Sequence, residues 1–430
     1  MTNKKTGPFG VLRATALTCA AALTLGTSSL SAQAEDTIKV GVLLPLSGNF
    51  AANGQQTLTG IKMYLDEIAN SVAGHKIELL VEDSQGKPDV AVTKARKLVE
   101  RDGAQMLSGI VSTGVALAVN DYARGAKVPL ILSGDAGGDD LTVPGPLANP
   151  YLVRVSQNGR TVAAAAADFA YKKGWRKATV IGSDYAGGVD TIYSFALAFC
   201  RLGGQVTQEQ WPPIGTSDFA PYLTNLDRKA DVMVAFNPGA DGLRLGKQYS
   251  EFGLTGKLPV LDIYATIVYE PNLPQLGDTT LGMYSSLLYS AMIKTPENER
   301  FVAEFKKRMG YLPSNEGPNG YVGMHAIADA VKTVNGDLKD TPKFIDALKE
   351  VKFSSPKGDI KLDKYGMVIQ SMYVREVQKV DGQLANVPVA TYNNVDQFWP
   401  MTYEEYESYK YGYKDLKGQL NDCSKLLAKK

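Results

Sequence analysis

The feature that most constrains the fold is a long alternation of strand-like and helix-like segments after residue 36. Short apolar runs, such as TIKVGVLL at 37–44 and AQMLSGIV at 104–111, are typical of buried strands, and between them apolar residues recur with helical spacing. Strands that alternate with helices form β-α-β units around a parallel sheet. A second series begins near YLVRV at 151–155. The sequence therefore predicts an α/β protein with two doubly wound parallel-sheet lobes.

The N-terminal segment has the pattern of an export signal. Basic residues precede an apolar segment at 14–30, and SAQA at 31–34 has the small residues that signal peptidase recognises. We expect residues 1–34 to be a signal peptide that is cleaved after Ala34. Cys19 lies inside the apolar segment rather than after it, so a lipid-modified cysteine is the less favoured alternative. No later stretch approaches the ~20 apolar residues of a membrane span.

Charge and motifs exclude several classes of function. The formal net charge is +1 and no long stretch is strongly basic, which argues against a nucleic-acid partner. The two histidines, His75 and His325, lie near no nucleophile motif and have no spacing typical of metal ligands. A G-x-S-x-G elbow, a P-loop and a G-x-G-x-x-G after the first strand are all missing. We therefore predict no catalytic residue, no metal and no cofactor.

The loops after the predicted strands are the places to look for a site. In open parallel sheets, ligands bind outside the carboxyl ends of the strands. One such loop is VSTG at 111–114, where Ser112 and Thr113 stand at the start of a predicted helix. A helix N-terminus offers unpaired N–H groups and partial positive charge, which together with two hydroxyls suit a carboxylate. The alternative is that one hydroxyl only caps its own helix.

A second candidate loop is SGDAGGDD at 133–140. Its glycines allow the backbone to approach a ligand closely and to offer amide groups without side-chain obstruction. The alternative is an ordinary turn between a strand and a helix, which glycine and aspartate also favour.

The order and spacing of these motifs resemble a known family. The segments PLSGNFAANG at 45–54, VEDSQGKPD at 81–89, SGIVSTGVALAV at 108–119, VPLILSGDAGGDD at 128–140 and DYAGG at 184–188 are similar to those of periplasmic solute-binding proteins of ABC importers, of the leucine and branched-chain amino-acid type. The similarity extends over nearly the whole mature chain.

The resemblance implies the type I periplasmic binding protein fold, in which three crossovers form the hinge between the lobes. We expect lobe 1 at 35–155 plus 283–363 and lobe 2 at 156–282 plus 364–395. It also implies a periplasmic protein that is not an enzyme and needs no cofactor.

The resemblance further implies which residues contact the ligand. Ser112 and Thr113 would hold its carboxylate together with main-chain groups of Asp135, Ala136 and Gly137. Tyr185 stands where the family has an aromatic side chain that closes over the ligand. The remaining expected lining residues are Phe50, Asn53, Pro238, Tyr264 and Tyr321.

The sequence departs from the amino-acid binders at one position. In that family lobe 2 carries an acid for the ligand's ammonium group, whereas the matching position here is Tyr264. A buried ammonium without a paired anion is costly. Asp135, Asp184 and Asp262 remain possible substitutes. An aromatic or apolar carboxylic acid is therefore favoured over a branched-chain amino acid.

The predicted mechanism is capture by lobe closure. Lobe 1 holds the carboxylate, lobe 2 closes over it, and the closed form is read by the permease subunits of an ABC importer. The expected protein is a monomer that does not itself span the membrane. A ligand-sensing protein of the same fold, acting in signalling, is the alternative, and a hydrolase that uses cleft carboxylates is a remote one.

The tail at 396–430 is not explained by the resemblance. Its apolar residues between Tyr406 and Leu427 recur at spacings of three and four, which predicts one face of a helix. Removing the signal peptide leaves Cys200 and Cys423 as the only cysteines. We predict that the tail packs on lobe 2 and that these two form a disulfide. The alternative is a tail used for oligomer contacts, with two free thiols.

Overall fold

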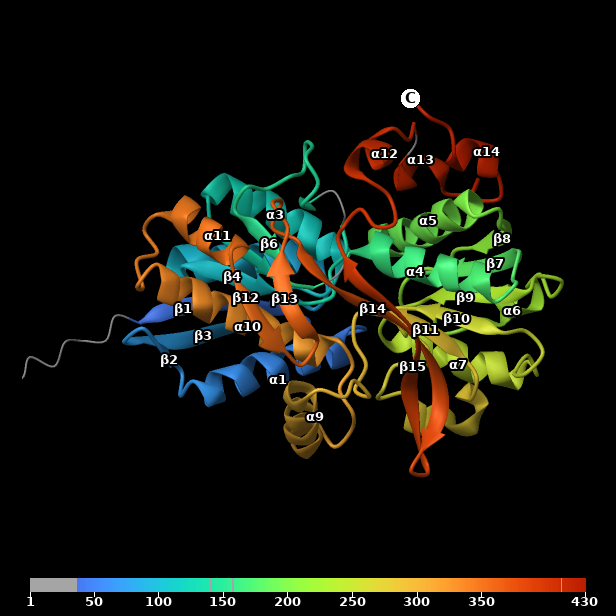
Figure 1. Cartoon of the computed structure of the whole chain (residues 1–430), viewed down its shortest axis with the longest axis horizontal. Coiled ribbons are helices and arrows are strands. Elements are labelled where there is room, and N and C mark those ends of the chain that lie inside the picture. Colours follow the sequence, from blue (N-terminus) through green and yellow to red (C-terminus); the bar gives the residue numbers. More distant parts are fainter. Residues whose placement is uncertain (1–36, 139–140, 157, 411) are drawn as a thin grey trace, which may run out of the picture. The chain divides into compact units, whose positions relative to one another are not determined.

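The computed structural model describes residues 37–138, 141–156, 158–410 and 412–430, which form two β-sheets (Figure 1). The first sheet has the strand order β2-β3-β1-β4-β5-β6, and its neighbouring strands are parallel except for the antiparallel pair β2 and β3. Its strands are β1 (Ile38–Leu44), β2 (Ser71–Val72), β3 (His75–Asp83), β4 (Met106–Gly109), β5 (Leu130–Leu132) and β6 (Leu152–Arg154).

Two predictions concern the N-terminus and the membrane. The signal peptide at 1–34, its cleavage after Ala34 and the lipid alternative at Cys19 all lie outside the described residues. Within the described ranges, no helix combines the length and the apolar character that a membrane crossing requires.

The first sheet is covered on both faces. In β1, Val40 and Val42 belong to a hydrophobic core that includes side chains of α1, α10 and α11, whereas Leu43 belongs to the opposite core, with α2, η1 and α3. Successive side chains of a strand point to opposite faces, so a strand buried on both sides needs a continuous apolar run. These helices are α1 (Ala51–Glu67), α2 (Pro88–Arg96), the π-helical η1 (Lys97–Arg101), α3 (Thr113–Ala126), α10 (Glu316–Thr333) and α11 (Thr341–Lys349).

The second sheet has the order β12-β13-β14-β11-β10-β9-β7-β8, with β15 paired to β14. Its strands are β7 (Lys177–Gly182), β8 (Gln205–Gln210), β9 (Val232–Phe236), β10 (Val260–Ile263), β11 (Tyr284–Leu287), β12 (Lys352–Ser355), β13 (Gly358–Leu362), β14 (Val368–Val380) and β15 (Gln383–Val395). The helical segments that accompany it are α4 (Gly159–Lys172), α5 (Ala186–Arg201), α6 (Ala220–Thr224), α7 (Ala240–Glu251), α8 (Leu273–Leu276) and η3 (Gly277–Thr280).

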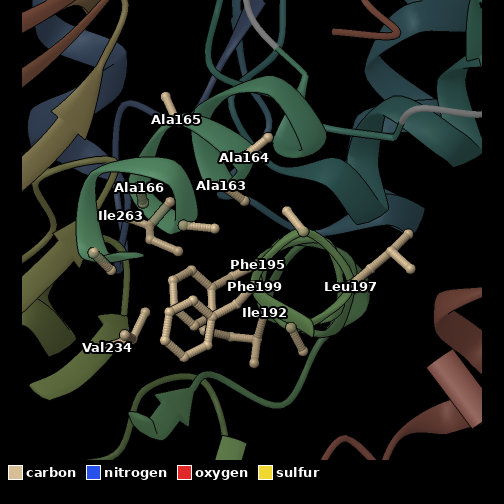
Figure 2. Packing of buried hydrophobic residues seen from close by; sticks show 14 of the residues in the cluster. Ala163, Ala164, Ala165, Ala166, Ile192, Phe195, Leu197, Phe199, Val234 and Ile263 are labelled. Carbon is tan, nitrogen blue, oxygen red and sulfur yellow. The ribbon is translucent and has the colours of Figure 1, made fainter. Parts of the chain in front are cut away.

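Figure 2 shows how α4 and α5 pack together over the second sheet. The run Ala163–Ala166 of α4 is almost fully buried, and its small side chains let the two helices approach closely. Phe195 and Phe199 of α5 are stacked, with 5.1 Å between their ring centroids, and lie near Val234 and Ile263 of the sheet. Burial of one such phenylalanine contributes about 1.5–3 kcal/mol. This core makes the start of α5 a rigid support for the loop that precedes it.

Within the described residues, the chain crosses three times between the part packed around the first sheet and the part packed around the second. It leaves the first sheet after β6, returns after β11 through α9 (Pro296–Met309) to α10, and leaves again within β14. Val368, at the start of β14, belongs to the core of the first sheet, whereas Met372 and Val374 belong to the core of the second. We call the first sheet with α1–α3, α9–α11, β12, β13 and the start of β14 lobe 1, because Ile360 of β13 and Val368 of β14 belong to the core of the first sheet. The rest of the second sheet with its helices is lobe 2.

One lobe boundary differs from the prediction. The sequence-based division started the second part of lobe 1 at residue 283, which includes β11. In the structure β11 pairs in parallel with β10 and antiparallel with β14, so it belongs to the second sheet. The partner of a strand is decided by backbone hydrogen bonds across the sheet, and its own pattern of residues does not reveal it.

The C-terminal tail does not form one helix from Tyr406 to Leu427, contrary to the prediction from its apolar spacing. It forms the short helices α12 (Tyr403–Glu407), α13 (Tyr413–Leu416) and α14 (Cys423–Leu426). Gly418 has a φ of 85°, in the left-handed region, which interrupts a helix at that point. The apolar residues still pack on lobe 2, because Leu416, Leu420 and Leu426 belong to the core formed by α4 and α5.

A disulfide joins the tail to lobe 2. Cys200, near the end of α5, and Cys423, at the start of α14, are bonded, with 5.5 Å between their Cα atoms and a sequence separation of 223. The tail lies beside α5 in Figure 1 and also forms ion pairs with lobe 2, between Glu405 and Arg201 and between Lys417 and Asp184.

Candidate ligand-binding site

A cavity lies where the loops of the two lobes meet. It has a free volume of about 50 Å³ and is lined by residues that follow β1, β4, β5, β7, β9 and β10, joined by the start of α10. Carboxyl ends of parallel strands are the expected place for a ligand in such sheets. The predicted site residues that line it are Phe50, Asn53, Thr113, Asp135, Gly137, Tyr185, Pro238 and Tyr264.

Three predicted residues do not line this cavity. The Tyr321 hydroxyl, on α10, donates to Glu67 Oε2 at 2.6 Å, and its ring packs edge-on against Tyr64, so it belongs to the contact between α1 and α10. Ser112 is the buried N-cap of α3 but its side chain makes no capping hydrogen bond. The Ala136 carbonyl accepts from Arg154, and its N–H donates to the Ile110 carbonyl.

The sequence reasoning missed other lining residues. They are Val111, Gly187, Thr191, Phe236, Gly239, Ala265, Thr266, Tyr269 and Glu316. Gly187 lies inside the segment DYAGG and Val111 inside VSTG, both of which were singled out in the sequence, but neither residue was predicted to contact the ligand. Glu316 had no local signal, because it reaches the cavity only through the packing of α10 on α1.

Thr113 is the polar group best placed to hold an anion. It is the first residue of α3, where backbone N–H groups lack intrahelical partners, and its Oγ1 accepts from the N–H of Gly137 at 3.0 Å. A methyl group placed on Gly187 would lie 2.7 Å from Thr113 Oγ1 and 2.8 Å from the Tyr185 hydroxyl. The start of α3 in lobe 1 and the start of α5 in lobe 2 therefore meet around the two hydroxyls.

This crowding gives a prediction about Gly187. Gly187→Ala should lower ligand affinity at least about tenfold, because the added methyl takes the space between Thr113 and Tyr185 and forces one hydroxyl to move. Gly114→Ala is the matched control, since a methyl there meets nothing closer than 3.6 Å. Titration calorimetry on both variants measures the difference. Equal affinities for the two would show that the ligand does not use this part of the cavity.

Aromatic rings form a wall of the cavity. Tyr185 stacks on Phe236 with 6.4 Å between ring centroids and lies 6.5 Å from Phe50, while Phe236 lies 5.3 Å from Tyr264. Burial raises the pKa of Tyr185 well above its usual value, and nearby carboxylates including Asp241 add to that effect. Its hydroxyl is therefore neutral and available as a hydrogen-bond donor. Rings at these separations suit the packing of another flat ring.

Asp262 positions the loop that carries Tyr264. Its carboxylate accepts hydrogen bonds from the Thr266 hydroxyl at 2.7 Å and from the N–H groups of Ile267 and Val268 at 2.6 and 3.0 Å. Burial raises the pKa of Asp262 to about 6, while these hydrogen bonds oppose that shift. Tyr264 has a φ of 65°, a conformation that non-glycine residues adopt rarely and that occurs often at binding sites. Asp262 thus supports the site and does not line it.

Asp135 and Glu316 bring two carboxyl groups to the cavity. Asp135 Oδ1 accepts from Asn315 Nδ2 at 2.5 Å and from Asn319 Nδ2 at 2.8 Å. The Glu316 side chain is 2 % exposed, and Asn53 donates a hydrogen bond to its Oε1. Burial raises the pKa of Glu316 well above its usual value, and the charge of Asp135 raises it further. Within the part of the chain that the structure describes, no group of three or more His, Cys, Asp or Glu side chains is arranged to hold a metal ion.

The sequence pattern of the periplasmic binding protein family matches residues 37–383. A curated relative, Leu/Ile/Val-binding protein homolog 6 of Brucella melitensis, is 32% identical over 384 residues, which cover 88% of this chain and 96% of the relative.

Two solved structures are similar to this chain over most of its length. One is a solute binding protein of an ABC transporter from Rhodopseudomonas palustris in complex with 3,4-dihydroxybenzoic acid, with 34% identity and a TM-score of 0.80. Another solute binding protein from R. palustris, in complex with 4-hydroxybenzoate, has 31% identity and a TM-score of 0.79. Each match covers 84% of this chain and 99% of the other.

Proposed function

Because this chain belongs to the periplasmic binding protein family, as a solute-binding protein of an ABC transporter, we propose that it captures an aromatic carboxylic acid between its lobes. Members of the family are substrate-binding transport proteins, so the prediction that the chain is not an enzyme is confirmed. The family also implies an exported, periplasmic protein. Delivery of the captured acid to membrane permease subunits is part of the proposal.

The observation that carries the proposal is an aromatic wall next to a hydroxyl anchor. Tyr185, Phe236 and Tyr264 offer ring faces and edges to a flat apolar body, while Thr113 and the start of α3 offer donors to a carboxylate. The two similar structures bound to hydroxylated benzoates support the same ligand class.

An α-amino acid is the second candidate, since the curated relative is named for leucine, isoleucine and valine. Two of the acids that would serve its ammonium group are occupied elsewhere. Asp184 pairs with Lys417 of the tail, and Asp262 is held by its own loop. Neither lines the cavity. Asp135 does line it, but two asparagine amides already donate to its Oδ1.

Lobe closure is the proposed mechanism, and contacts across the cavity support it. Asn49 of lobe 1 donates from Nδ2 to the Pro238 carbonyl of lobe 2 at 3.1 Å and accepts the N–H of Ala240 at 3.1 Å. A methyl group on Gly239 would lie 2.4 Å from the Asn49 carbonyl oxygen, so only glycine permits this approach. These contacts hold the loops that follow β1 and β9 together in the closed arrangement of the lobes. A ligand that touches both lobes would favour this closed arrangement.

Calorimetric titration with benzoate, 4-hydroxybenzoate and leucine tests the ligand class. We expect the aromatic acids to bind more tightly than leucine. In a thermal-shift assay, a ligand at a free concentration a hundred times its Kd should stabilise the native state by about 2.7 kcal/mol. Strong leucine binding together with no binding of either aromatic acid would reject the proposal.

A further inference from the structure

Tyr269 is a buried tyrosine that lines the cavity from the side of lobe 2. It lies in the loop between β10 and α8 and is 7 % exposed. Just before it, the N–H of Val268 donates to the Asp262 carboxylate. The Tyr269 carbonyl in turn accepts the N–H groups of Asn272 and Leu273. The backbone at Tyr269 is therefore fixed on both sides, and its side chain has a defined position at the cavity.

A hydrogen bond from lobe 1 decides how the Tyr269 hydroxyl can bond. Gln56 of α1 is fully buried and does not line the cavity. Its Oε1 accepts the N–H of Ser314 at 3.0 Å, and its Nε2 lies 2.6 Å from the Tyr269 hydroxyl oxygen. A backbone N–H can only donate, so the amide oxygen of Gln56 must face Ser314 and its NH2 group must face Tyr269. Since an amide NH2 group also only donates, the Tyr269 oxygen is the acceptor in this bond.

The proton of the Tyr269 hydroxyl is left for another partner. Among the residues that the structure describes, no side chain and no carbonyl accepts it. Burial raises the pKa of Tyr269 well above its usual value, and charges that include Glu316 and Asp135 raise it further. Both of these carboxyl groups line the cavity, which places the hydroxyl end of the ring on that side. A buried donor without an acceptor is costly, and the open space beside it is the cavity.

This arrangement of donors and acceptors depends on lobe closure. Gln56 and Ser314 belong to lobe 1, whereas Tyr269 belongs to lobe 2, so separation of the lobes breaks the bond between Gln56 and Tyr269. In an open form, water can both donate to the Tyr269 hydroxyl and accept from it. Closure therefore engages the oxygen of Tyr269 with Gln56 and turns its proton toward the ligand.

We propose that Tyr269 donates a hydrogen bond to an oxygen atom of the bound acid, and that Gln56 is a positioning residue for this donor. The inference rests on the proposed function for the class of ligand. The acceptor is an oxygen of the carboxylate, which every such acid has, or an oxygen on the ring. A ligand that accepts this bond favours the closed arrangement, because the donor is oriented only there.

Tyr269→Phe tests the donor, by calorimetry with benzoate and 4-hydroxybenzoate. Affinity for 4-hydroxybenzoate should fall at least about fivefold, which is the effect of one lost hydrogen bond. Benzoate has oxygen atoms only in its carboxylate, so an equal loss for benzoate identifies the carboxylate as the acceptor, and a loss for 4-hydroxybenzoate alone identifies the ring oxygen. Tyr311→Phe is the matched control, since Tyr311 does not line the cavity, and it should bind both acids as the wild type does. Unchanged affinities in Tyr269→Phe, or an equal loss in Tyr311→Phe, would overturn the inference.

Gln56→Met distinguishes a ligand donor from a simple contact between the lobes. It removes the partner of Tyr269 but leaves the hydroxyl proton for the ligand, so affinity should fall less than in Tyr269→Phe. The double variant should bind as Tyr269→Phe does, because Gln56 acts through Tyr269. Urea unfolding verifies that each variant is folded. Equal losses in the two single variants would show that only the contact between the lobes matters and would refute the donor.

Titration of the wild type separates this inference from the proposed function. If Tyr269→Phe keeps the wild-type affinity for the aromatic acids, the inference fails and the proposed function stands. If the wild type binds leucine and neither aromatic acid, the proposed ligand class is wrong. The same variants are then compared with leucine, whose carboxylate can accept the same bond, and an unchanged leucine affinity in Tyr269→Phe would reject the donor as well. A wild type that binds none of the three ligands contradicts both.

Discussion

Replacing Cys423 with serine lowers the free energy of unfolding by about 2–5 kcal/mol while leaving ligand affinity unchanged. The bond to Cys200 closes a loop of 223 positions, and cross-linking so long a loop removes much of the conformational freedom of the unfolded chain. The cavity is unaffected because neither cysteine lines it. Urea unfolding with and without a reducing agent measures the effect.

The matched comparisons for this prediction are the single and double cysteine variants. Cys423→Ser and the double variant with Cys200→Ser should be equally destabilised, and the reductant should affect only the wild type. Two reactive thiols per chain in the unfolded, non-reduced protein would contradict the disulfide. The tail should stay docked in all variants, since Leu420 remains buried and the Glu209 carboxylate accepts the N–H groups of Gly418 and Leu420.

Thr113→Val should weaken binding of the aromatic acid about ten- to a hundredfold. The change removes the hydroxyl but keeps the size of the side chain, and a hydrogen bond to a charged group is worth about 1.5–3 kcal/mol. The variant should also lose about 1–3 kcal/mol of stability, because the N–H of Gly137 loses its acceptor. Calorimetry and urea unfolding separate the two effects.

Thr113→Ser and Ser112→Ala serve as controls for that prediction. Thr113→Ser keeps the hydroxyl and should retain most of the affinity. Ser112→Ala should have little effect, because Ser112 does not line the cavity. A normal affinity for Thr113→Val combined with a loss for Ser112→Ala would reverse the assignment and restore Ser112 as the anchor.

The alternation of strands and helices in the sequence was enough to predict the two-sheet α/β architecture. Apolar runs at 37–44 and 104–111 form strands buried on both faces, because only such runs fit between two layers of helices. The sequence also predicted that Thr113, Asp135 and Tyr185 contact the ligand, and all three line the cavity. Each follows a strand, and the carboxyl ends of parallel strands share one edge of a sheet.

Tertiary structure alone decided the other features. Glu316 faces the cavity and Tyr321, five positions later on the same helix, does not: at about 3.6 residues per turn the two point in different directions. Periodic apolar spacing in the tail likewise did not predict its helices. The spacing suits one helix, but the chain forms short helices and has a left-handed residue at Gly418.

In the two lobes, the local sequence was enough to predict which elements form. The direction in which α10 presents its side chains depends on how closely its backbone packs on α1. Gly60 and Gly320 permit that packing, because a methyl group on them would lie 1.8 Å from the Gly317 carbonyl oxygen and 2.1 Å from that of Thr57.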